Sequence, residues 1–132
     1  MVEQQVDEAL MKADRWSKVI ALFFAMGTYG LAILLTSNNT FNASVAAFAG
    51  IGVRLYIPYH ASVSGYGGEQ VPSQAHSATG NYHHGAVGAG LVVGSFLALG
   101  IMIVEPTYWT ALIGGVAGGI VSFLVLRSTL PS

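Results

Sequence analysis

Histidine is the residue type of this chain with the broadest chemistry. All four histidines fall in a polar insert over residues 59–85, the only long interruption of an apolar sequence: His60, His76, His83 and His84. Neutral imidazole is a common metal ligand, and a histidine-rich tract can bind haem or a divalent metal. The spacing fits no metal motif, and Glu69 is the only carboxylate in the insert. The sequence therefore favours a solvated loop without cofactor, and haem or metal ligation in a membrane redox complex is the alternative.

Three charged residues beside apolar segments form a second candidate set: Arg54, Glu105 and Arg127. Ionisable groups within a membrane can mark a proton or cation path, so a small channel or transporter using Arg54 and Glu105 is another alternative. Tyrosines and a proline follow Arg54, and a proline and aromatic residues follow Glu105. Such surroundings are typical of the membrane interface. We expect all three charges to be interfacial, although Arg54 could instead be paired inside a bundle.

The composition places these residues in a membrane. Of 132 residues, 53% are hydrophobic and 8% are charged, whereas soluble domains carry about 25% charged residues. The net charge is −1 and no run of Lys or Arg occurs, which argues against nucleic-acid binding. The absence of cysteine excludes disulfides and thiol nucleophiles, and no G-x-S-x-G motif is present. We assign no catalytic residue and do not expect an enzyme.

Four apolar segments are long enough to cross a bilayer core of about 30 Å. The predicted transmembrane helices cover residues 17–36, 41–59, 84–104 and 110–126. Residues 3–16 carry apolar side chains at helical spacing between charged ones, which predicts an amphipathic helix on the headgroups. Residues 60–83 form the polar loop. The predicted fold is an all-α integral membrane protein, a single membrane domain over residues 1–132, with its four transmembrane helices paired as two hairpins.

The polar turn at residues 37–44 follows the first span, and Asn42 or Ser44 is expected to cap the next helix.

Positive charges predict the orientation. In a four-span topology all basic residues lie on the side of the N-terminus: Lys12, Arg15, Lys18, Arg54 and Arg127. The positive-inside rule then places both termini and the histidine loop in the cytoplasm. A three-span topology would move Arg127 to the other side of the membrane and would agree less well with the positive-inside rule.

Glycines predict how the helices pack. The candidate packing positions lie in the last two spans: Gly88, Gly90, Gly94, Gly114, Gly115, Gly118 and Gly119. Several are four residues apart, and this GxxxG spacing allows close helix contact in lipid. The pattern leaves open whether each face meets the same chain or another copy.

So small an apolar chain is expected to be a structural or accessory membrane protein. Its expected partners are membrane lipid together with further copies of itself or other membrane subunits, and a virion membrane or capsid lattice belongs to this class.

Overall fold

The described part of the chain forms four helices, which are joined by short turns and by the segment that contains His76. The computed structural model describes residues 2–63 and 82–130. The helices are α1 (Val2–Leu35), α2 (Asn39–Val63), α3 (Tyr82–Val104) and α4 (Tyr108–Thr129). Each contains a stretch long and apolar enough to span a membrane. The predicted all-α membrane fold with four spanning helices is therefore confirmed.

The first helix has no boundary where the sequence predicted one. Residues 3–16 are helical, but they continue without a break into the first span, so α1 is one helix of 34 residues. The Ser17 hydroxyl donates a hydrogen bond of 2.6 Å to the Asp14 carbonyl of the same helix. It therefore does not act as an N-cap that would start a new helix. At 1.5 Å per residue α1 is about 51 Å long, well over the thickness of a bilayer core.

The other helix ends differ from the predicted spans by at most four residues, and α3 ends at Val104 as predicted. α2 starts at Asn39 and continues past Pro58 to Val63, and α3 starts at Tyr82, so the predicted loop over residues 60–83 is shorter at both ends. His60, His83 and His84 consequently belong to helices. The remaining part of that loop, with Glu69 and His76, lies outside the described residues.

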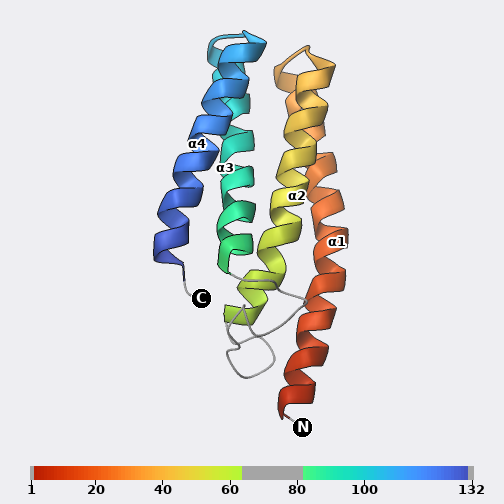
Figure 1. The fold of residues 1–132 in the computed structure, drawn as a ribbon. Helices are drawn as coiled ribbons and strands as arrows, with labels where there is room; N and C mark the ends of the chain where they lie inside the picture. The colour runs from red at the N-terminus through yellow and green to blue at the C-terminus, as the bar shows by residue number, and fades with distance from the viewer. Residues whose placement is uncertain (1, 64–81, 131–132) are drawn as a thin grey trace.

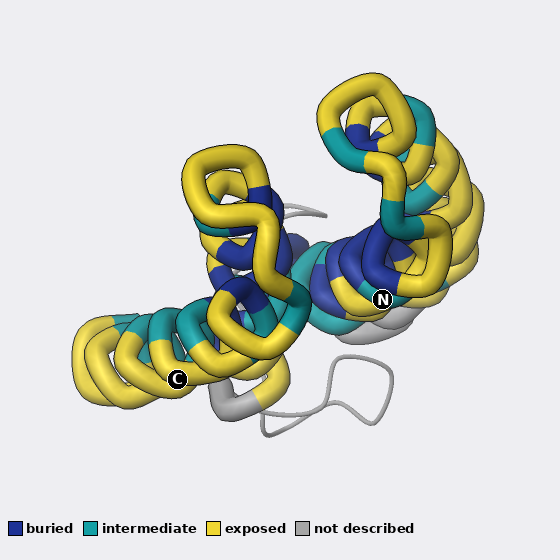
Figure 2. Tube along the Cα trace, turned by 90° about the horizontal axis from the view of Figure 1, so that it is seen from above, coloured by how far each residue is buried: buried dark blue, intermediate teal, exposed yellow. Residues whose placement is uncertain are grey.

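The helices stand side by side in an open row, and each packs mainly on its neighbours in sequence. Figure 1 shows both termini at one end of the molecule, with the α1–α2 and α3–α4 turns at the other. Viewed along the helices, the row zigzags, and buried residues lie mainly on the faces between adjacent helices (Figure 2). The outer faces are exposed, as expected for surfaces that meet lipid.

A small apolar core joins the helices near the two turns. Its fully buried members come from all four helices: Ala32, Phe41, Val45, Ala98, Leu99, Met102 and Ala111. The rings of Phe41 and Tyr108 meet edge to face with their centroids 6.2 Å apart. Farther along the helices from the turns, the rings of Phe24 on α1 and Phe96 on α3 are in contact, with their centroids 5.9 Å apart. The two hairpins are thus held together at the turn end.

A buried polar clasp closes the α1–α2 turn. Asn38, not Asn42 or Ser44, caps α2: its side-chain oxygen accepts a hydrogen bond of 2.9 Å from the Phe41 amide. Asn42 is fully buried. Its amide donates to the Thr36 carbonyl at 3.1 Å, and its oxygen accepts a hydrogen bond from the Thr36 hydroxyl. Both polar ends of this asparagine are therefore satisfied.

We predict that Asn42→Ala destabilises the protein by about 1–3 kcal/mol, because the Thr36 hydroxyl and carbonyl would lose their partner in a buried site. The measurement is reversible SDS unfolding in mixed micelles followed by tryptophan fluorescence. Asn39→Ala, an exposed substitution in the same turn, is the matched control and should change stability by less than about 0.5 kcal/mol. Equal effects of the two substitutions would contradict a role for the clasp.

Candidate functional site

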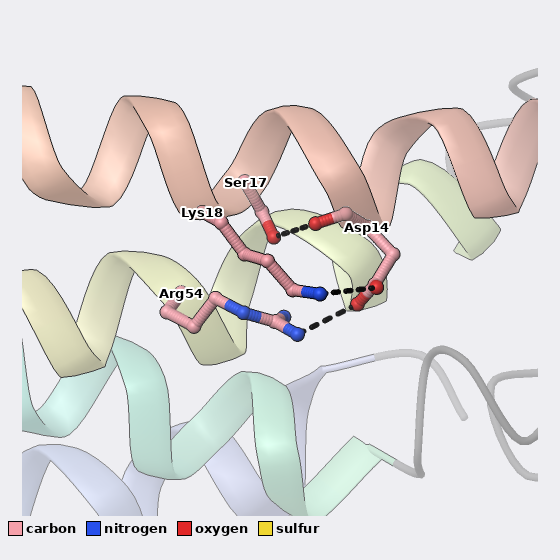
Figure 3. Close-up of polar contacts among 4 residues, drawn as sticks. All are labelled: Asp14, Ser17, Lys18 and Arg54. Carbon is pink, nitrogen blue, oxygen red and sulfur yellow. Dashed lines mark hydrogen bonds and ion pairs between the residues drawn. The ribbon is translucent and has the colours of Figure 1, made fainter.

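An ion-pair cluster joins the first two helices. The carboxylate of Asp14 on α1 lies 2.9 Å from the Arg54 guanidinium on α2 and 3.8 Å from the Lys18 ammonium, one turn along α1. Figure 3 shows all three side chains converging on one point between the helices. The side chain of Asp14 is 17% exposed and that of Arg54 is 34% exposed. Arg54, which we expected at the membrane interface with pairing inside a bundle as the alternative, forms an ion pair with Asp14.

The depth of this cluster explains why an arginine is tolerated there. Twenty-one residues separate Asp14 from Leu35 at the turn end of α1, which corresponds to about 31 Å along the helix axis. The Arg54 backbone lies fifteen residues from Asn39, or about 22 Å from the same end. Asp14 is therefore about one bilayer-core thickness from the turn. The Arg54 side chain, whose backbone lies nearer the turn, reaches the Asp14 carboxylate, so its charge can lie at the membrane edge.

The other two candidate charges are not brought to this cluster. Glu105 is exposed in the turn between α3 and α4, at the end of the molecule opposite Arg54. Its backbone carbonyl accepts a hydrogen bond of 2.6 Å from the Thr107 amide. Arg127 is exposed in the last turn of α4, at the end where both termini lie. Arg54 and Glu105 therefore do not form a paired site within the spans.

The described histidines lie at helix ends. His60 is exposed and stacks on Tyr56 with ring centroids 5.7 Å apart. His84 is exposed in the first turns of α3. Among the side chains that the structure describes, no three of His, Asp or Glu gather where they could hold a metal ion. His76 lies outside the described residues, and the side chain of His83 is likewise not described.

The predicted packing glycines of α3 and α4 meet each other within the chain. A Cβ added to Gly94 would lie 2.8 Å from the Gly115 carbonyl oxygen, and one added to Gly90 would lie 2.9 Å from that of Gly119. Real Cβ atoms do not approach backbone this closely without a shift of the helices. Gly114 and Gly118 face only the side-chain ends of α3 residues, so their contacts are more adaptable.

A second close crossing joins α2 and α3. Only Gly88, its α3 side, was predicted from the sequence. A Cβ on Gly88 would lie 2.5 Å from the Gly52 carbonyl oxygen, and a Cβ on Gly52 would lie 2.5 Å from the Gly88 carbonyl oxygen. Gly50, two residues earlier, lies close to α1, although less closely: its Cβ would be 2.9 Å from that of Ala25 and 3.2 Å from the Ala21 carbonyl oxygen. The signal was present in the alternating small residues of that segment, AAFAGIG.

An apolar groove of about 290 Å³ runs along α3 between α2 and α4. Glycines of the α3–α4 crossing lie along it, and aromatic side chains line its flanks, among them Phe41, Phe48 and Phe123. It contains almost no polar surface, with Ser44 and Ser95 among the few hydroxyl groups on its lining. Nothing in this groove provides a path for ions or an anchor for a polar substrate.

We predict that Gly94→Ala destabilises the protein by about 1–3 kcal/mol, because its methyl group would force α3 and α4 apart. Gly27→Ala on α1 is the control, since a Cβ there meets nothing within 4 Å. Unfolding in mixed micelles should show a lower free energy of unfolding for Gly94→Ala and an unchanged one for Gly27→Ala. Unchanged stability of that variant would mean that the crossing is looser than described.

Comparisons with known proteins gave no match to a family model, to a curated protein or to a solved structure.

Proposed function

We propose that this chain is a structural subunit of a membrane-embedded homo-oligomer, such as the protein lattice of a virion membrane. The observation that supports it most is the sparse burial of the edge helices. Within the spanning windows, 17% of α1 and 11% of α4 are buried, against 39% of α2 and 33% of α3. Two long helices with one packed face each leave extensive surface for neighbours.

The order of the helices suggests how copies associate. α1 and α4 run in opposite directions at the two edges of the row. A second copy in the same membrane orientation can therefore place its α1 beside α4 and continue the antiparallel alternation. Such a head-to-tail contact repeats from copy to copy and builds rings or lattices. Gly27 and Gly30 on α1 have open space around them, which allows a neighbouring helix to approach closely.

As an accessory subunit of a larger membrane complex, the chain would use the same exposed faces of α1 and α4 to contact other proteins. The oligomer test below distinguishes this role from self-assembly. The channel alternative has less support, because Arg54 is paired with Asp14 and Glu105 lies at the opposite end. The redox alternative would require histidines that converge, and His60 and His84 are exposed helix-end residues.

The oligomer test compares two substitutions of open glycines. Native mass spectrometry in mild detergent should show oligomers of the wild type. Gly27→Leu on the edge helix α1 should weaken self-association about tenfold, because the added side chain blocks close approach. Gly100→Leu on the inner helix α3 is the matched control, since that glycine also has nothing within 4 Å.

A strictly monomeric wild type would contradict self-assembly and direct attention to other membrane subunits. Equal weakening by both variants would contradict the choice of α1 as the contact helix.

We also propose that both termini and the histidine loop are cytoplasmic, on the basis of the five basic residues at that end. The chain contains no cysteine, so single cysteines report topology without background. A membrane-impermeant maleimide added to intact cells should label Ser37→Cys in the α1–α2 turn and leave Ser128→Cys near the end of α4 unlabelled. Labelling of Ser128→Cys without labelling of Ser37→Cys would contradict this orientation.

A further inference from the structure

The basic residues are concentrated at one end of the molecule. All five basic residues lie towards the end of the molecule that carries the termini: Lys12, Arg15, Lys18, Arg54 and Arg127. Along α1 the only carboxylate interspersed among Lys12, Arg15 and Lys18 is Asp14. The opposite interface has Glu105 and no basic residue. Glu3, Asp7 and Glu8 precede these cations on α1, so the excess of positive charge is local to the stretch from Lys12 to Lys18 and to Arg54.

The excess is sharpest where two cations share one carboxylate. Each oxygen of Asp14 faces one cation, Arg54 at 2.9 Å and Lys18 at 3.8 Å. Together the three groups carry a net charge of +1. A guanidinium has five N–H donors and an ammonium three, so donors remain after the contacts with Asp14. The Lys18 side chain is 62% exposed and can turn towards a further anion.

The surroundings specify what kind of anion fits. Asp14 lies about 31 Å from the turn end of α1, about the thickness of a hydrocarbon core, so with that turn at one membrane interface Asp14 lies at the level of the lipid phosphates of the other. One turn deeper on the two helices, Leu22 and Ile51 are exposed apolar side chains. A ligand at this point would thus meet cations at its head and apolar surface along its tail.

We infer that Lys18 and Arg54, positioned by Asp14, bind the headgroup phosphate of an anionic phospholipid whose acyl chains lie along α1 and α2. The ammonium and guanidinium donate charge-assisted hydrogen bonds to phosphate oxygens. Asp14 holds the two cations together and, as the competing anion, moderates the affinity. This site does not depend on the oligomeric state of the chain.

The test is lipid binding to the full-length protein in mild detergent, measured by native mass spectrometry with phosphatidylglycerol and with phosphatidylcholine. Wild type should prefer phosphatidylglycerol. The double variant Lys18→Gln/Arg54→Gln should bind it about ten- to thirtyfold more weakly, with little change for phosphatidylcholine. The matched control Lys12→Gln/Arg127→Gln removes the same charge from the same end and should retain the preference.

If both double variants lost phosphatidylglycerol affinity equally, general electrostatic attraction would account for the binding, and the specific site would be overturned. Should the Arg54 variant fail to fold, Lys18→Gln alone decides, with an expected loss of several-fold, and an unchanged affinity would also overturn it. Displacement of the lipid by excess inorganic phosphate would instead indicate a site for a soluble anion.

Discussion

Helix backbones that touch each other without intervening side chains are the contacts on which the rest of this structure depends. In lipid, apolar side chains gain little by leaving their surroundings, so helices associate through close packing. Here backbone meets backbone where Gly52 crosses Gly88 and where Gly94 crosses Gly115. Because the small residues occupy these faces, the large apolar side chains point outwards, and the row remains open instead of closing into a bundle.

Polar interactions complement this packing at two levels along α1. The Thr36–Asn42 clasp fixes the turn end, and the Asp14–Arg54 pair fixes the level about one bilayer thickness away. Between these levels Thr28 is buried, and its hydroxyl donates to the Phe24 carbonyl of its own helix. The first hairpin therefore contains the polar constraints that set its depth, whereas α3 and α4 depend on glycine contacts.

Composition and hydropathy were sufficient to predict the membrane class, the number of spans and their approximate bounds, because length and apolarity decide what can cross a bilayer. Helix boundaries were harder to predict: residues 3–16 continue into the first span without a break, and Asn38 caps α2 where Asn42 or Ser44 was expected. The pairing of Arg54 with Asp14 could not be derived, since it joins residues forty positions apart. For the glycines, spacing identified the packing faces of α3 and α4, but only the fold showed that they meet within one chain.

The sequential order of the row affects how the protein can be made. Each helix rests mainly on the one synthesised just before it, so no segment has to wait for a distant part of the chain or pass between helices already in place. Loop-closure entropy remains small at every step. The first hairpin can acquire its clasp and its ion pair while the second is still on the ribosome, which limits the time that half-inserted glycine faces are available to wrong partners.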